Sequence, residues 1–205
     1  VLRSNFIVTI CQTKKGETFI GTRQGLYRFN ETENSFSNIE AIPSSAFVHT
    51  MIEDRNGILW IGTMGNGLFF YDPNSKGSGN ITYQVQNKKG ISSNSITTLF
   101  QDSGGVLWLG TEGGGLSKFN TADSSFIHYS TANGFPANTI FKILEDNSKK
   151  LWITTSRGLV HFDPATSRLH VYTTASGLLS DQFNYNSGYK DRNGKMYFGS
   201  VKGLI

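Results

Sequence analysis

DSGGVLWLGTEGGGLSKFN, the stretch at residues 102–120, recurs along this chain in recognisable copies. DRNGILWIGTMGNGLFFYD at 54–72 and DNSKKLWITTSRGLVHFD at 146–163 are close copies, while TKKGETFIGTRQGLYRFN at 13–30 and DRNGKMYFGSVKGLI at 191–205 are more distant ones. The anchor aromatics Phe19, Trp60, Trp108, Trp152 and Tyr197 are therefore 41, 48, 44 and 45 residues apart. This spacing is the period of a four-stranded propeller blade, so the chain is predicted to be a repeat array.

Each repeat divides into four short strands. In the third repeat, 96–102 alternates apolar and polar residues, 106–110 is a bulky apolar run, 116–120 alternates again and 126–129 is a short outer strand. Glycine-rich turns separate these pieces, and no sustained helical period occurs. In the second repeat the outer strand is expected around Tyr83.

The predicted fold class is therefore all-β: a β-propeller with four complete four-stranded blades and a partial fifth. The single domain 1–205 is predicted to contain blades at about 5–40, 47–86, 96–130 and 140–174, and a half blade at 183–205. The chain begins without methionine and stops within the third strand of the fifth repeat. We therefore expect a fragment of a larger propeller array, whose open edges pair with neighbouring blades of a parent protein or drive self-association.

The recurring aromatic and glycine residues have predicted structural roles. Trp60, Trp108 and Trp152, with Tyr197 in the last copy, are expected to fill the space between adjacent blades. Gly62 and Gly110 follow the tryptophans by two positions and suit a close approach of backbones. The next glycine in each copy is expected to adopt positive φ in a hairpin. These positions are Gly25, Gly67, Gly115, Gly158 and Gly203.

Composition and charge exclude several classes of function. The 205 residues include 23 glycines and are only 17% charged, a balance typical of turn-rich β proteins. The net charge of +4 is spread without long basic runs, so nucleic-acid binding is not expected. The glycine clusters lack a following Lys-Ser or Lys-Thr, and the single Cys11 cannot form an internal disulfide. No cofactor is expected, and isolated His49, His128, His161 and His170 give no metal-ligand spacing.

The repeat unit resembles a known family. The pattern D-x-x-G-x-L-W-[IL]-G-T-x-x-G-L-x-x-[FY], preceded by G-[LIF]-x-x-N-x-I at 90–96 and 134–140 and by a variant at 177–183, is similar to the two-component regulator propeller repeat. DQFNYNSGYKDRNGKMYFG at 181–199 resembles a segment near the end of sensor propellers in hybrid two-component systems of Bacteroides-type bacteria.

The resemblance implies a periplasmic sensor of carbohydrate, commonly oligosaccharide, within a protein anchored in the inner membrane. In such proteins a further β domain, a transmembrane helix, a histidine kinase, a receiver and a DNA-binding domain follow the propeller, which signals through a phosphorelay. None of those later parts lies within these 205 residues. The parent is thus expected to be a sensor histidine kinase, whereas this fragment is expected to have no enzyme activity.

Strand direction indicates where a ligand would bind. In antiparallel blades, the loop that leads into each inner strand and the hairpin between the second and third strands emerge at the same end. The hairpins contribute Arg23, Gln24, Met64, Asn66, Glu112, Arg157 and Lys202, and the lead-in loops contribute Asn94, Asn138, Asp181 and Gln182. Amide and guanidinium groups suit sugars, and the excess of basic over acidic hairpin residues suggests an acidic or sulfated glycan. For Asn94 and Asn138, which recur in register, the alternative is that they bond turn backbone.

Two other functions remain alternatives. The variable hairpins would also suit a protein-interaction platform. Glycosidase-type propellers place the Trp of their Asp box five residues after the Asp, whereas Asp102 and Trp108 are six apart. Glycoside hydrolysis also requires two neighbouring carboxylates, but Glu53, Asp54, Glu145 and Asp146 fall on turns at the opposite end, where a turn-capping role is favoured. The catalytic residues of a streptogramin-lyase-type propeller cannot be placed on this chain.

Overall fold

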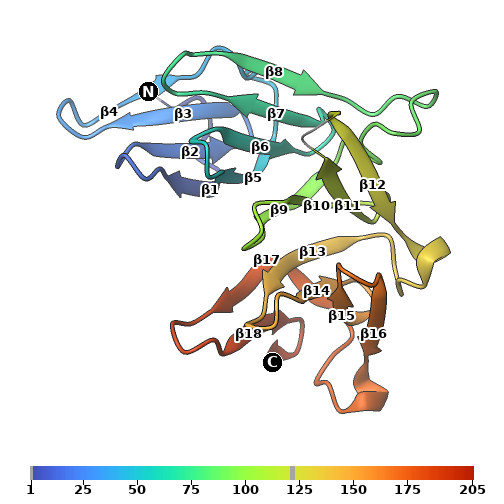
Figure 1. Ribbon diagram of the computed structural model, residues 1–205. Coiled ribbons are helices and arrows are strands. Elements are labelled where there is room, and N and C mark those ends of the chain that lie inside the picture. Colours follow the sequence, from blue (N-terminus) through green and yellow to red (C-terminus); the bar gives the residue numbers. More distant parts are fainter. Residues whose placement is uncertain (1, 121–122) are drawn as a thin grey trace. The chain divides into compact units, whose positions relative to one another are not determined.

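The computed structural model describes residues 2–120 and 123–205 (Figure 1). The chain divides into two compact units, residues 1–99 and 100–205, and each is described by itself. Among the described residues, no helix is long and apolar enough to cross a membrane.

The first unit contains two four-stranded antiparallel sheets, blade 1 and blade 2. In each sheet the strands follow chain order, so that every strand pairs with the next one along the sequence. Blade 1 consists of β1 (Ile7–Gln12), β2 (Thr18–Thr22), β3 (Gly25–Asn30) and β4 (Ser35–Asn38). Blade 2 consists of β5 (Val48–Glu53), β6 (Leu59–Thr63), β7 (Leu68–Tyr71) and β8 (Ser78–Ile81).

The boundary between the units falls within β9 (Ile96–Gln101), the first strand of blade 3. Blade 3 continues with β10 (Leu107–Thr111), β11 (Leu116–Asn120) and β12 (Ser125–Tyr129). Blade 4 consists of β13 (Ile140–Glu145), β14 (Leu151–Thr155), β15 (Gly158–Asp163) and β16 (Arg168–Tyr172). Blade 5 has three strands, β17 (Phe183–Lys190), β18 (Met196–Ser200) and β19 (Gly203–Leu204).

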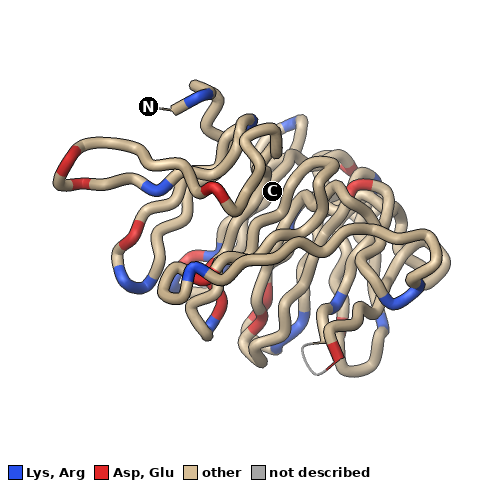
Figure 2. Tube along the Cα trace, turned by 90° about the horizontal axis from the view of Figure 1, so that it is seen from above, with Lys and Arg blue, Asp and Glu red and all other residues tan. Residues whose placement is uncertain are grey.

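The predicted fold class is confirmed: the sheets are antiparallel meanders, as in propeller blades. The described helical content is limited to two 3₁₀ turns, η1 (Thr131–Asn133) and η2 (Thr174–Ser176), which precede the lead-in loops of blades 4 and 5. Figure 2 shows that most charged residues lie in turns and at strand ends, with largely uncharged strands between them.

A hydroxyl and a glycine close the second hairpin of each blade. In blade 2, Thr63 Oγ1 donates to the Gly67 carbonyl at 2.7 Å and accepts from the Asn66 amide at 3.2 Å. Thr22, Thr111, Thr155 and Ser200 donate to the corresponding glycine carbonyl. The predicted positive φ is confirmed at all five hairpin glycines. A Cβ at Gly67 would also lie 2.4 Å from the Ile81 carbonyl oxygen, so the hairpin requires glycine there.

Apolar faces of consecutive blades pack together within each unit. In the first unit, Phe19 and Leu26 of blade 1 pack against Val48, Met51 and Ile61 of blade 2. In the second unit, one core joins blades 3 and 4, and another, around Phe141 and Phe198, joins blades 4 and 5. Burial of these faces is the main stabilising contribution, at about 25 cal/mol per Å² of apolar surface.

The anchor aromatics differ in burial. Trp108 is fully buried, and its ring lies edge-on to Phe162 of blade 4 at 6.1 Å, which confirms its predicted position between blades. Trp152 is half-buried and packs against the core of blades 4 and 5. Trp60 and Tyr197 are also half-buried, with Trp60 against Phe70 of its own blade. Phe19, the anchor of blade 1, is also fully buried, so Phe19 and Trp108 are enclosed between blades, whereas the other three anchors are half-buried.

The close approach at Gly62 involves side chains and not, as expected, backbones. A Cβ there would lie 2.6 Å from Thr50 Cγ2 on β5 and 2.7 Å from Ile96 Cγ2 on β9. Gly110 holds the same register position on β10, opposite Leu116 as Gly62 is opposite Leu68. Gly62 therefore leaves room for the branched side chain of Ile96, which begins the next blade.

The outer strand of blade 2 lies earlier than expected: β8 ends at Ile81, and Tyr83 is an exposed residue beyond it. The Asp72 side chain accepts hydrogen bonds from the Asn74 amide and the Ser75 hydroxyl, and the Asp72 amide donates to the Gly77 carbonyl. This compact turn reverses the chain quickly enough for the strand to start at Ser78.

Candidate functional site

Hydrogen bonds join the second hairpin of one blade to the lead-in loop of the next. In the first unit, the Gly67 amide donates to the Asn94 carbonyl at 2.9 Å, and the Gly25 amide donates to the Ala46 carbonyl at 2.9 Å. In the second unit, the Gly115 amide donates to the Asn138 carbonyl and the Gly158 amide to the Asp181 carbonyl, both at 2.8 Å. Within each unit, the two kinds of loop are therefore neighbours, as the alternation of strand direction predicts.

Side chains of the lead-in loops accept hydrogen bonds from backbone amides. Asn94 Oδ1 accepts from the Tyr83 amide at 2.7 Å, Asn138 Oδ1 from the Thr131 amide at 2.8 Å and Asp181 Oδ1 from the Thr174 amide at 2.5 Å. The structural alternative for the two asparagines is confirmed, and Asp181 acts in the same way. Gln182 is exposed, and its carbonyl accepts from the Val201 amide at 3.1 Å.

In the first unit, Arg23 lies between two aromatic rings. Its guanidinium carbon is 4.5 Å from the ring centroid of Phe6 and 5.6 Å from that of Phe47, distances typical of cation–π contacts. The hairpin residues Gln24 and Asn66 are exposed, and Met64 is half-buried and bridges to Ser95. The two rings and the guanidinium offer both apolar surface and hydrogen-bond donors.

In the second unit, Glu112 of the β10–β11 hairpin lies near Tyr185 of β17. Burial raises the pKa of the Tyr185 hydroxyl, and the negative charge of Glu112 raises it further. Tyr185 is 44% exposed, and its ring lies edge-on to Phe141 at 4.7 Å. The hairpin residues Arg157 and Lys202 are exposed. The second unit thus has an accessible aromatic ring beside an acid.

Four aromatic residues near these loops, Phe6, Phe47, Phe141 and Tyr185, were not among the predicted site residues. Each stands at or near the start of an inner strand, where an apolar residue is expected for packing alone. In the sequence, such a residue could be recognised only by another aromatic or basic residue in the adjoining loop. Which residue contacts which could not be told without the register between blades.

Acidic residues at the opposite ends of the blades form hydrogen bonds that stabilise the turns. In blade 3, Asp102 Oδ1 accepts from the Val106 amide at 2.9 Å and Oδ2 accepts from Trp108 Nε1 at 2.8 Å. Asp54 with Trp60 and Asp146 with Trp152 repeat this arrangement at 3.0 and 3.1 Å. The predicted turn-capping role of Asp54 and Asp146 is confirmed, and the six-residue spacing matches a structural hydrogen bond.

Two glutamates tie consecutive blades together at the same end. Glu53 Oε2 accepts from the Lys14 amide at 2.7 Å in the first unit, and Glu145 accepts from the Ser103 amide and hydroxyl, both at 2.9 Å, in the second. Among residues 2–120 and 123–205, no group of three or more His, Cys, Asp and Glu side chains is arranged to hold a metal ion.

Known proteins share this repeat. The sequence profile of the two-component regulator propeller matches residues 42–65, 90–113 and 134–157. The extracellular domain of a protein assigned as a hybrid two-component system from B. thetaiotaomicron is 26% identical, with a TM-score of 0.81 over 97% of this chain and 27% of that chain. This chain is also 34% identical over 73 residues to histidine kinase P4 of Formosa agariphila, covering 36% of this chain and 5% of the kinase.

The chain is therefore a β-propeller array in which three segments match the two-component regulator propeller repeat. It spans about a quarter of the solved B. thetaiotaomicron chain and a twentieth of the kinase. A virginiamycin B lyase from Staphylococcus aureus has a TM-score of 0.74 at 10% identity, covering 98% of this chain and 66% of the lyase, a likeness of fold alone.

Proposed function

We propose that this chain is the ligand-sensing propeller segment of a hybrid two-component sensor. The main support is that three of its segments match the regulator propeller repeat. In addition, 97% of the chain superposes on the extracellular domain of such a system. The parent protein would be anchored in the inner membrane, with the propeller in the periplasm and a histidine kinase inside the cell.

The proposed ligand is an oligosaccharide bound at the hairpin and lead-in loops. In the first unit, exposed Asn66 supplies hydrogen-bond donors and Phe6 an accessible ring on which a sugar can stack. In the second unit, exposed Arg157 and Lys202 supply donors and Tyr185 supplies the ring. Asn94, Asn138 and Asp181 contribute indirectly, because their side chains position the loops. The basic hairpin residues favour acidic glycans over neutral ones.

The mechanism would be binding without bond cleavage. The blade-end aspartates each accept a tryptophan N–H and a backbone N–H, so they are poor candidates for general acids or nucleophiles. The hairpins that would hold the ligand are hydrogen-bonded to the lead-in loop of the next blade. Ligand binding at one hairpin would therefore alter the position of that loop and of the inner strand that follows it. The parent kinase would respond to that change.

Isothermal titration of the chain with neutral and acidic oligosaccharides tests the proposal, with chromatography of the same mixtures to detect cleavage. We expect saturable binding without products, weakened by Arg157→Ala or Asn66→Ala and by added salt. Arg192→Ala, which removes an exposed charge from the β17–β18 turn, is the matched control and should leave binding unchanged. Turnover would assign the chain to the enzymes, and failure of every oligosaccharide to bind would favour a protein-interaction platform.

A further inference from the structure

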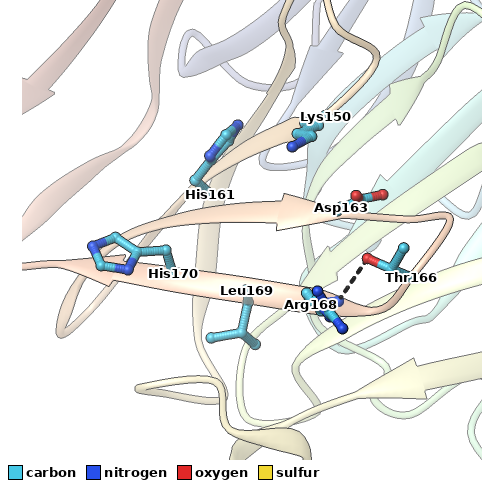
Figure 3. Close-up of a pocket in the computed structure, with 7 residues that line it drawn as sticks. All are labelled: Lys150, His161, Asp163, Thr166, Arg168, Leu169 and His170. Carbon is cyan, nitrogen blue, oxygen red and sulfur yellow. Dashed lines mark hydrogen bonds between the residues drawn. The ribbon is translucent and has the colours of Figure 1, made fainter.

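Blade 4 contains a pocket of about 280 Å³ on its outer strands, away from the loops described above (Figure 3). All of its lining comes from this one blade, at the start of β14 and along β15 and β16. The polar lining consists of Lys150, His161, Asp163, Thr166, Arg168 and His170.

The pocket is rich in groups that carry or can gain positive charge. Lys150 and Arg168 are basic side chains, and His161 and His170 are directly opposite each other in the β15–β16 register. Asp163 is the one carboxylate in the lining. Its Oδ1 accepts from the Ala165 amide at 3.0 Å, and this bond, ahead of smaller contributions from Thr166 and Lys150, holds the pKa of Asp163 below its usual value.

The other blades show that the sheet does not require these basic groups. The register position of His170 is taken by Ser37 in blade 1, Gly79 in blade 2 and Ile127 in blade 3. The position of Arg168 is taken by Ser35 in blade 1 and Ser125 in blade 3. Small or uncharged side chains therefore suffice for the outer strand, and blade 4 alone places a histidine and an arginine there.

His161 is held in a defined orientation. Its ring stacks on Trp152 at 4.3 Å, and its Nε2 lies 3.0 Å from Asp146 Oδ2. Donation from Nε2 to the carboxylate leaves Nδ1 for a ligand. In Figure 3, Lys150 and His161 project to the same side of the sheet, whereas Leu169 points away from it. His170 is braced edge-on against Tyr172 at 4.5 Å, so both imidazoles are positioned by aromatic neighbours.

We propose that this pocket is a second binding site, specific for the anionic group of an acidic sugar, such as the carboxylate of a uronic acid or the sulfate of a sulfated sugar. Arg168 and Lys150 would bind the anion with charge-assisted hydrogen bonds, and the imidazole faces would pack against the sugar ring. The volume is at the lower limit for ligand pockets, so it fits one ring and not an extended chain. The proposal is independent of ligand binding at the hairpin loops.

The test is titration of the chain with methyl glucuronide and glucose 6-sulfate, with neutral methyl glucoside for comparison, followed by NMR of the histidine imidazoles. We expect the acidic sugars to bind and to shift the His161 and His170 signals. Arg168→Ser and His170→Ser introduce the serine that blade 1 carries at each equivalent position, so the variants should still fold. Loss of the arginine contact should weaken binding about tenfold or more, as for a charge-assisted hydrogen bond.

Arg192→Ser, in the β17–β18 turn, lowers the net charge by the same unit and should leave affinity unchanged. Inorganic sulfate should compete with the acidic sugars, because the anion supplies the recognition. Equal binding of methyl glucoside, equal weakening by Arg192→Ser, or a lack of competition by sulfate would overturn the proposal. Binding of an acidic peptide in place of either sugar would also overturn it and would assign the pocket to a protein partner.

Discussion

Asp54, Asp102 and Asp146 show how one side chain can join two adjacent strands. Each closes the turn between the first and second strands with Oδ1 and holds the tryptophan ring of the second strand with Oδ2. A carboxylate supplies two acceptor atoms for two different donors, and no amide or hydroxyl side chain can do the same.

At Asp102 this leads to a stability prediction. Asp102→Asn replaces one acceptor oxygen by an NH₂ group, so either the Val106 amide or the buried Trp108 Nε1–H loses its acceptor. We expect a loss of about 1–3 kcal/mol in the free energy of unfolding, measured with urea. In a Trp108→Phe background, which has no indole donor, the same change should cost less.

Blade 5 provides the control within the chain. Asp191 Oδ1 accepts from the Asn193 and Lys195 amides, and Tyr197 stands at the tryptophan position. Asp191→Asn keeps that oxygen and should therefore have a smaller effect than Asp102→Asn. Equal losses at the two positions would show that the indole hydrogen bond contributes nothing.

Asp146 should make stability dependent on pH. Burial alone would raise the pKa of Asp146, but hydrogen bonds from the Lys150 amide, His161, the Ser148 amide and Trp152 outweigh burial and lower it. The carboxylate therefore stabilises the fold above the unfolded pKa of about 3.9, and this contribution disappears as the pH falls through the lower folded-state pKa. Thermal unfolding should show Asp146→Asn less stable than wild type near neutral pH, with the difference shrinking in acid. A difference that stays constant with pH would contradict this.

The capping role of these aspartates could be predicted from sequence, because an Asp at the end of a strand followed by Asn, Ser or Gly is typical of turns. Their bond to tryptophan could not be predicted without the register. Trp60 pairs with Ile52, two residues before Asp54, so the two side chains are diagonal neighbours across the hairpin.

At the scale of the element, three residues of the W-x-G-T run in the second strand of blades 2 and 3 each have a separate structural role. The tryptophan anchors the turn, the glycine makes room for the next blade and the threonine closes the hairpin. Strand order and hairpin glycines could therefore be predicted from the repeats. The early start of β8 could not, because it depends on hydrogen bonds of the Asp72 side chain within its turn.

Gly62→Ala tests the space requirement. The new methyl would lie within 2.7 Å of Thr50 Cγ2 and Ile96 Cγ2, so we expect a loss of about 1–3 kcal/mol from overpacking. Chemical denaturation of the single variant and of Gly62→Ala in an Ile96→Ala background measures the coupling. The penalty should be smaller where Ile96 is truncated.

Gly77→Ala is the matched control. This glycine lies in the exposed turn before β8, and an added Cβ would have the Ser75 hydroxyl as its neighbour at 3.1 Å. The change should stay within about 0.5 kcal/mol of wild type. If Gly62→Ala were equally mild, the glycine would not be required by packing between blades.

At the scale of the whole molecule, blade 1 exposes a face that other blades bury. Ile10 pairs with Ile20 as Met51 pairs with Ile61 and Ile143 with Ile153. Met51 and Ile143 are 7% and 1% exposed and pack against the preceding blade, whereas Ile10 is 62% exposed. Ile7, at the start of the same strand, is 50% exposed.

We therefore predict that the chain self-associates through this face, since exposed apolar surface of a sheet recruits a partner. Sedimentation equilibrium should show oligomers that Ile10→Lys shifts toward monomer. Ile127→Lys is the control, because Ile127 is also half exposed but lies on β12, the outer strand of blade 3. A wild-type chain that is monomeric at high concentration would contradict the prediction.

The repeat period was sufficient to predict the fold class, because each copy contains its own strands, turns and apolar faces. The ligand loops were a weaker inference. Their aromatic partners come from separate segments of the chain, as Phe6, just before β1, does for Arg23. The pocket on blade 4 could not be predicted from the sequence, because only the turn between β15 and β16 places His161 and His170 opposite each other.

The bonds from Gly67, Gly115 and Gly158 to the next blade give these hairpins an unexpected property. Amide protons at exposed loop tips ordinarily exchange with D₂O almost at once, because such loops open locally with little free energy. These three amides donate to carbonyls of the loop that leads into the next blade, so they can open only when the hairpin and that loop separate. Their deuterium uptake should match that of the strands, and a pull on one hairpin would be transmitted as tension to the following blade.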